Sequence, residues 1–127
     1  MKNEANGSAI VIGSQSLISS GIKKMLKPYF RTIYFLSDLQ AAMTEVADEQ
    51  VRLILLMDHE KNETVPEVAR ACRRAFPSAK ILGLFDAFNP EQEVVLRTAG
   101  VVFLGSYERF ARNSRTILTK ALNSALS

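Results

Sequence analysis

Three residues of types that often carry chemistry are consecutive in one polar stretch of the chain. Asp58, His59 and Glu60 lie within the sequence DHEKNE, and His59 is the only histidine. Their side chains have the chemistry of a general base or of metal ligands. Adjacent residues in a loop rarely converge on one ion, and the surrounding sequence is polar throughout. We therefore interpret His59 as a solvated surface residue and predict no metal site here.

The second candidate for reactivity is Cys72, the only cysteine. A single cysteine excludes an intramolecular disulfide and a zinc site with several cysteines. Cys72 falls on the inner face of a predicted helix, so we expect a small buried hydrophobic residue. With one histidine, one cysteine and no cluster of acids, the sequence predicts a protein that is not an enzyme and needs no cofactor.

A third candidate is the stretch Gly13-Ser14-Gln15-Ser16, which follows a predicted strand and leads into a predicted helix. Backbone amides at the start of a helix can bind a phosphate group. The stretch lacks the glycine spacing of a P-loop or of a dinucleotide-binding fingerprint. A flavodoxin-like domain that binds a small ligand or a nucleotide at this loop therefore stays open as the alternative hypothesis.

Basic side chains are concentrated at the end of the chain. Residues 97–127 contain Arg97, Arg109, Arg112, Arg115 and Lys120 and one acid, Glu108. Such a pattern is typical of a solvated helix face. Arginine also suits interface ion pairs better than lysine does. We select Arg97, Arg109, Arg112 and Arg115 as a candidate interface for a homodimer or for a regulatory protein partner.

The composition is that of one globular domain. The 127 residues are 47% hydrophobic and 23% charged, and 16 Lys and Arg against 13 Asp and Glu leave a net charge of +3. This bias is too small to argue for nucleic acid. The longest apolar runs are too short to cross a membrane, and the polar beginning, MKNEANGS, lacks a signal-peptide pattern. We expect a cytoplasmic protein that does not bind membranes, with one domain over residues 1–127 and a core over about 8–126.

Short apolar runs alternate with helical patterns along the whole sequence. Strands are predicted at residues 8–12, 31–36, 52–57, 79–85 and 101–104. Helices are predicted at 16–27, from 37 through 47, from 64 to just before Pro77, at 90–98 and at 107–126. The second of these helices is expected to bury Leu39, Met43, Val46 and Ala47. Strict alternation requires parallel strands with crossover helices. The predicted fold class is α/β: a three-layer sandwich around a five-stranded parallel sheet in the flavodoxin-like order 2-1-3-4-5.

Several segments resemble one known family. They are AIVIGSQSLISSGIKKML near the beginning, then LILLMD, FPSAKILGLF, NPEQEVVLRTAG and VVFLG. Together they are similar to the receiver domains of bacterial response regulators, in the branch that carries a LuxR/NarL-type DNA-binding domain. The resemblance spans about residues 8–124. It implies a domain of two-component signal transduction that takes part in transcription regulation and reaches DNA only through an output domain that this chain does not contain.

The residues at the family's functional positions differ from those of a working receiver. The resemblance implies two acids for magnesium after the first strand, a phosphoacceptor aspartate after the third, a hydroxyl after the fourth and a lysine after the fifth. These positions fall on Gly13 and Ser14, on Met57, on Phe85, and on Ser106 or Tyr107. Asp58 lies one residue beyond the phosphoacceptor position and stays a second, weaker candidate.

These replacements predict a degenerate phosphorylation pocket. A glycine and a serine do not bind magnesium well, because this cation requires carboxylates, and methionine accepts no phosphoryl group. We expect Met57 and Phe85 to fill the pocket with apolar surface. The resemblance therefore implies an atypical receiver, or pseudo-receiver, that acts by protein contact and not by phosphorylation.

Overall fold

The computed structural model describes residues 7–13, 16–36, 39–46, 50–57, 65–85 and 90–123. The strands are β1 (Ser8–Ile12), β2 (Thr32–Leu36), β3 (Val51–Met57), β4 (Lys80–Leu84) and β5 (Val101–Gly105). The helices are α1 (Ser16–Leu26), α2 (Leu39–Glu45), α3 (Val65–Ala75), α4 (Pro90–Thr98), α5 (Tyr107–Arg112) and α6 (Ser114–Asn123). The bounds of every strand agree with the prediction to within one residue.

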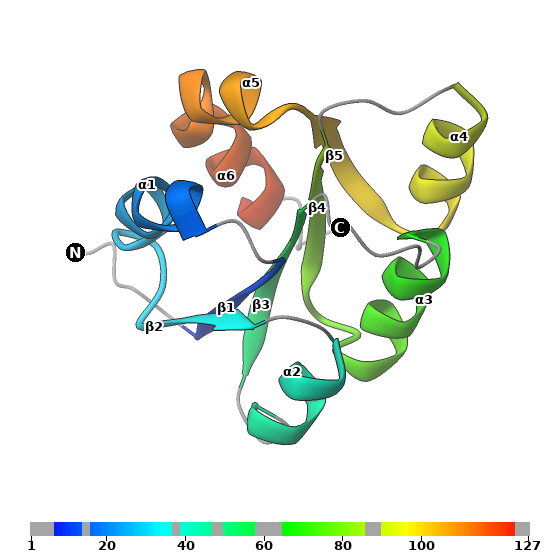
Figure 1. Cartoon of the computed structure of the whole chain (residues 1–127), viewed down its shortest axis with the longest axis horizontal. Helices are drawn as coiled ribbons and strands as arrows, with labels where there is room; N and C mark the ends of the chain where they lie inside the picture. Colours follow the sequence, from blue (N-terminus) through cyan, green and yellow to red (C-terminus); the bar gives the residue numbers. More distant parts are fainter. Residues whose placement is uncertain are drawn as a thin grey trace.

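The five strands form one parallel sheet in the order β2-β1-β3-β4-β5 (Figure 1). The predicted fold class is therefore confirmed. In this order β2 and β5 are the edge strands, and the direction in which the sheet is built reverses between β1 and β3. Open parallel sheets bind ligands beyond the carboxyl ends of the strands at such a reversal.

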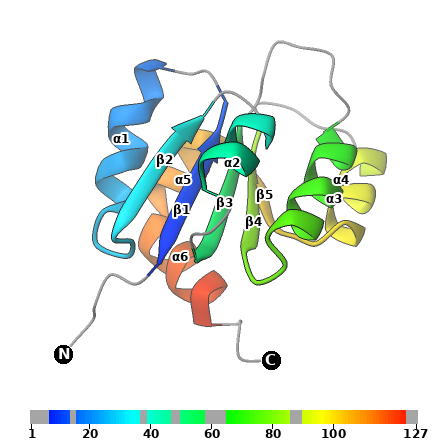
Figure 2. The same ribbon diagram turned by 90° about the horizontal axis from the view of Figure 1, so that it is seen from below.

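Two layers of helices cover the sheet, and each layer buries one face of it. Helices α1, α5 and α6 lie on one face, and α2, α3 and α4 lie on the other (Figures 1 and 2). Side chains of β3 alternate between the two layers: Ile54 and Leu56 pack toward α2–α4, whereas Leu55 and Met57 pack toward α1, α5 and α6. Burial on both faces explains why β3 is apolar at nearly every position.

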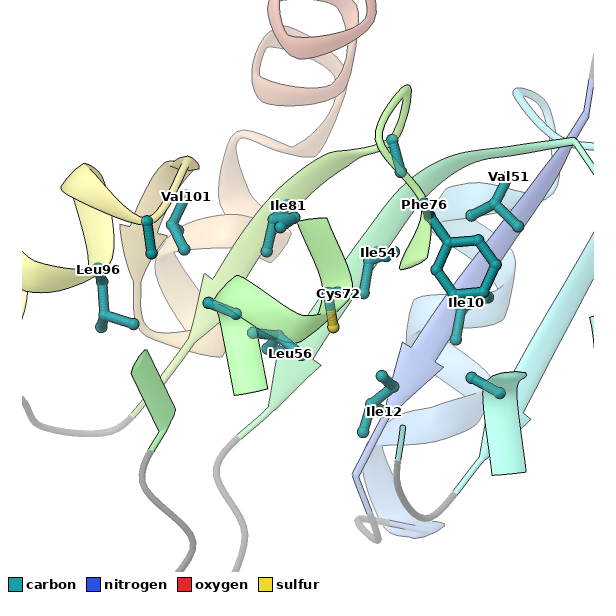
Figure 3. Close-up of a cluster of buried hydrophobic side chains, with 14 of the residues drawn as sticks. Ile10, Ile12, Val51, Ile54, Leu56, Cys72, Phe76, Ile81, Leu96 and Val101 are labelled. Atoms are coloured by element: carbon teal, nitrogen blue, oxygen red, sulfur yellow. The ribbon is translucent and has the colours of Figure 1, made fainter. Parts of the chain in front are cut away.

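The cluster under α2, α3 and α4 is built from side chains of all three helices and of four strands. Figure 3 labels ten of them: Ile10, Ile12, Val51, Ile54, Leu56, Cys72, Phe76, Ile81, Leu96 and Val101. Cys72 projects from α3 into the middle of this cluster and is fully buried. The structure thus bears out the expected burial of this thiol.

The buried face of α2 differs from the prediction. Ala42 and Val46 are fully buried, whereas Met43 is 48% exposed. The side chain of Leu39 and residue Ala47 lie outside the described residues. Residues at i and i+4 lie above one another on a helix, so the Ala42–Val46 pair defines a narrower inner stripe than we expected. Ala42 and Val46 make the contact with the core cluster, and Met43 lies to the side of it.

The last helix, predicted as one element over residues 107–126, is interrupted at Asn113. The backbone there leaves helical geometry, with φ −123° and ψ 25°. The Asn113 side-chain amide donates a hydrogen bond to the Arg109 carbonyl at 3.1 Å, and its backbone N–H lies within reach of the carbonyls of Arg109 and Phe110. Asparagine competes for backbone partners in this way and so ends helices. The result is two short helices, α5 and α6, that meet at an angle and still bury Phe110, Leu118 and Ala121.

Helix length also bears on membrane association. Within the described parts of the chain, no helix combines the length and the apolar character that crossing a bilayer requires.

The burial of Cys72 gives a testable prediction. Desolvation raises the pKa of its thiol from the ordinary 9.0 to about 12. Between these values the folded state keeps the proton and the unfolded state loses it, so the free energy of unfolding should fall as the pH rises above about 9. We expect the native protein to resist a thiol reagent at pH 8 and to react with one equivalent after unfolding in urea.

The matched control is Cys72→Ala, whose stability should depend less on pH between about 9 and 11. Rapid labelling of the native protein, or an identical pH dependence in both proteins, would show that this thiol is not held in the core.

Candidate functional site

The candidate site lies where the carboxyl ends of the parallel strands meet at one edge of the sheet. Gly13 follows β1, Met57 ends β3, Phe85 follows β4, and Ser106 and Tyr107 follow β5. Ser14 and Asp58, the other members of the predicted pocket, lie outside the described residues, as do His59 and Glu60. None of the five described residues carries a charged side chain.

Met57 is packed directly against Gly13. A methyl group at position 13 would lie only 2.9 Å from Met57 Cβ, which is closer than such carbon atoms approach in proteins. Gly13 also has φ +153°, a conformation that favours glycine, and its N–H donates to the Leu36 carbonyl at 3.0 Å. Met57 is only 4% exposed. Position 13 therefore cannot hold an acid unless the backbone or Met57 moves.

Phe85 is buried as well, with 5% of its surface exposed. Its backbone N–H donates to the Gly105 carbonyl at 2.9 Å, and its ring lies over Gly83, where a methyl group would be 2.6 Å from the Phe85 Cε2 atom. The ring packs into the cluster under α2–α4, whereas Met57 packs into the cluster under α1, α5 and α6. The expectation that the two side chains fill one pocket is therefore wrong. Met57 pairs in register with Leu84, and the next residue, Phe85, points to the opposite face.

Ser106 and Tyr107 are engaged in positioning α5. Ser106 is its N-cap, and its Oγ accepts a hydrogen bond from the Arg109 N–H at 3.1 Å. This bond satisfies a donor that the start of the helix leaves unpaired. The Tyr107 hydroxyl reaches α1: a methyl group at Gly21 would lie 2.6 Å from it. Neither residue supplies the positive charge that a lysine would bring to this edge.

The described residues also offer no ligand set for a metal. No three histidine, cysteine or acidic side chains among them lie close enough to hold an ion. Magnesium binds through carboxylates and water, and the described side chains at the strand ends are apolar or hydroxylic. Among the described residues of this edge, the side chains therefore pack against one another or cap a helix.

Sequence reasoning missed Gly21 and Gly83, the glycines over which Tyr107 and Phe85 lie. Their only signal in the sequence is a small residue inside a helix and inside a buried strand, which often marks a close approach. The identity of the approaching ring could not be read from the sequence.

The arginines selected as a candidate interface have different local surroundings. Arg97 forms an ion pair within α4, with its Nε 3.1 Å from Glu93 Oε2. Arg109 lies over the Phe103 ring, 6.0 Å from its centroid. Arg112 is exposed on α5, whereas Arg115 lines a separate hollow near the end of α1. An exposed pair within one helix contributes little stability, about 0.5 kcal/mol or less.

A groove of about 580 Å³ follows the free edge of the sheet, between β5 and the helices α5 and α6. We call it the β5 groove; its lining includes Val102, Phe103, Arg109, Asn113, Ile117 and Lys120. Val102 on the edge strand is 44% exposed, and Val94 on the neighbouring α4 is 64% exposed. Edge strands with exposed apolar residues are places where a partner chain can dock.

The contact between Met57 and Gly13 gives a prediction for stability. Gly13→Ala should lower the free energy of unfolding by about 1–3 kcal/mol, because it adds a methyl group against Met57 and forces an unfavourable φ. Urea unfolding followed by circular dichroism measures this change. The matched control is Gly21→Ala, where only the tip of Tyr107 must move and alanine favours the helix by about 1 kcal/mol. Equal losses in the two variants would contradict the tight packing at Gly13.

Among known proteins, the matches to this chain come from solved structures. No protein-family model matches this chain, and no curated protein sequence matches it. Solved structures do. The signal receiver domain of an HD domain-containing protein from Pseudomonas fluorescens Pf-5 is 18% identical, with a TM-score of 0.78, over 93% of this chain and 95% of that one.

Two further solved structures also match this chain. The beryllofluoride-activated NtrC4 receiver domain dimer is 15% identical, with a TM-score of 0.73, over 93% of this chain and 98% of that one. Salmonella typhimurium RcsB, a response regulator studied for its DNA interaction, is 14% identical, with a TM-score of 0.76, over 90% of this chain and 60% of that one. At these identities the likeness establishes the fold: this chain has the fold of the response regulator receiver domains that it resembles.

Proposed function

We propose that this chain is a degenerate receiver domain of the response regulator family, of the LuxR/NarL-like branch, that signals by protein contact without aspartyl phosphorylation. The observation that carries the proposal is Met57, which ends β3 at the reversal of strand order, is 4% exposed and is packed against Gly13. A receiver needs a carboxylate at the end of this strand. A thioether accepts no phosphoryl group.

The surroundings of Met57 support the same interpretation. Magnesium would require acids at Gly13 and Ser14, and the conformation and packing of Gly13 disfavour one of them. Phe85 replaces the hydroxyl group that follows β4 in a working receiver. The Ser106 hydroxyl is committed to the N-cap of α5, and the Tyr107 hydroxyl lies against α1. The machinery that would bind and sense a phosphoryl group is therefore missing at each of these described positions.

Asp58 stays the weaker candidate for a phosphoacceptor. It follows Met57 directly in the sequence but lies outside the described residues. With a glycine and a serine at the two acidic positions, a magnesium ion beside Asp58 would lack the carboxylates that hold it. The alternative of a small ligand or nucleotide at the Gly13–Ser14 loop has less support, because Met57 occupies the space beside Gly13.

The proposal predicts that phosphorylating reagents do not modify this protein. Incubation with acetyl phosphate and magnesium should leave the mass of the intact protein unchanged, because no described residue at the strand ends can accept the group. Beryllofluoride with magnesium should likewise leave the amide spectrum unchanged. A phosphorylation-competent receiver treated in parallel serves as the positive control. A mass increase of one phosphoryl group, mapped to Asp58 and abolished by Asp58→Asn, would overturn the proposal.

The β5 groove is the surface that best fits the contact role. It combines an unpaired strand edge, exposed Val102 and the cations Arg109 and Lys120. The NtrC4 receiver was solved as a dimer, which supports association as a function of this fold. We propose a homodimer, or a regulatory protein partner, at this groove, and DNA contact only through a separate output domain. In RcsB, whose structure concerns DNA interaction, the match covers 60% of a longer chain, which is in keeping with that arrangement.

Sedimentation velocity tests the association. The parent should form a dimer at micromolar concentrations. The double variant Val102→Asp, Arg109→Glu should dissociate it, because Val102→Asp places a charge on the apolar strand edge and Arg109→Glu reverses the charge of a cation that lines the groove. Arg115→Glu is the matched control, since Arg115 lines another hollow and its reversal should leave the dimer intact. A parent that stays monomeric at high micromolar concentration excludes the homodimer. If Arg115→Glu dissociated the dimer and the Val102→Asp, Arg109→Glu variant did not, the interface would lie away from β5.

A further inference from the structure

A second hollow lies at the opposite end of the sheet from the candidate site. It has a volume of about 450 Å³, which is within the range of small-molecule sites. The turn after α1, the start of β3 and one side of α6, from its first turn to its last, line it. Its lining includes Tyr29, Arg52, Arg115, Thr119, Leu122 and Asn123. We call it the Arg52–Arg115 hollow.

A β-bulge directs Arg52 into this hollow. Ser8 of β1 pairs with Val51, and the next residue, Ala9, pairs with Leu53, so Arg52 is the extra residue on β3. Bulges of this kind re-aim a side chain and are common beside functional sites. The neighbouring strand residues Val51 and Leu53 are both buried in the core, whereas Arg52 is only half-buried. The bulge thus places one cationic side chain at the edge of the core, on a strand that is otherwise apolar.

The stem of Arg52 is held in place by Gly7. A methyl group at position 7 would lie 2.9 Å from Arg52 Cγ, and Gly7 has φ +73°, which favours glycine. The Gly7 carbonyl accepts a hydrogen bond from the Arg31 N–H at 3.0 Å, which fixes this end of the chain beside β2. An arginine whose stem is packed loses less freedom when its guanidinium binds a ligand.

The charge in the hollow has no counterpart among the described residues. The ion pair found in the described parts of the chain joins Arg97 and Glu93 on α4, and no described carboxylate pairs with Arg52 or Arg115. Two guanidinium groups at one hollow repel each other unless an anion lies between them. Guanidinium groups match the oxygens of a phosphate in pairs of hydrogen bonds. The Thr119 hydroxyl and the Asn123 amide line the same hollow and can add further hydrogen bonds.

The rest of the lining is apolar. The Tyr29 ring and the Leu122 side chain are half-buried beside the cations. A pocket that combines converging polar groups with an aromatic and an aliphatic wall is typical of sites for small organic ligands. We infer that the Arg52–Arg115 hollow binds a small organic phosphate, whose phosphate group is held by the two arginines and whose apolar part lies against Tyr29 and Leu122.

Isothermal titration of the full chain tests this inference with three probes: inorganic phosphate, adenosine 5′-monophosphate and uncharged adenosine. We expect the monophosphate to bind with one site, inorganic phosphate to bind more weakly, and adenosine not to bind. Amide shifts caused by the monophosphate should map to residues 29, 52, 115, 119 and 122–123. Affinity should fall as salt is added, because the contact is between charges.

Arg52→Gln and Arg115→Gln should each lower the affinity for the monophosphate by about tenfold or more. Arg115 is exposed, so its variant tests the site even if Arg52→Gln unfolds the protein. The matched control is Arg112→Gln, which removes the same charge outside the hollow and should leave the affinity unchanged. Absence of saturable monophosphate binding overturns the inference. So does binding that maps to the β5 groove, that falls equally in the Arg112→Gln variant, or that adenosine reproduces.

Discussion

The packing of Met57 against Gly13 is the contact on which the interpretation of this domain depends. It lies where β1 and β3 run side by side and where the order of strands reverses, which is the ligand-binding edge of this fold. A working receiver keeps repelling acids there and bears the cost in stability, since clustered carboxylates raise one another's pKa. In this chain the described contact at that edge is apolar: a buried thioether packs against a glycine with φ +153°.

Most of the fold could be predicted from the sequence, because its main signals are local. Continuous apolar runs such as that of β3 reveal strands that are covered on both faces, and Pro90 and Ser8 mark element boundaries that the structure reproduces. The predictions that failed concern tertiary contacts and the bonds of single side chains. Asn113 divides the last helix through a side-chain bond to the Arg109 carbonyl, and Met43 is exposed because Ala42 makes the contact. Helical periodicity alone does not distinguish these cases.

The candidate site was predictable in position and less so in geometry. Parallel strands must bring Gly13, Met57, Phe85 and Ser106 to one edge, and the structure places them there. The pairing of Met57 with Leu84, which sends Phe85 to the opposite face, depends on strand register and not on residue type. The bulge that directs Arg52 into its hollow likewise depends on strand register. Register is set by the packing of whole elements, so a pattern of residue types does not contain it.

The measurement that tests the central claim most directly is the free energy of unfolding of Met57→Asp, compared with Met57→Leu, with and without magnesium. The account predicts that Met57→Asp loses about 2–4 kcal/mol, because a carboxylate would be buried among apolar side chains, and that magnesium restores none of it. Met57→Leu should lose less than about 1.5 kcal/mol, since it conserves volume. A Met57→Asp variant as stable as the parent, or one that magnesium stabilises, would contradict the account by showing an open acidic pocket at the end of β3.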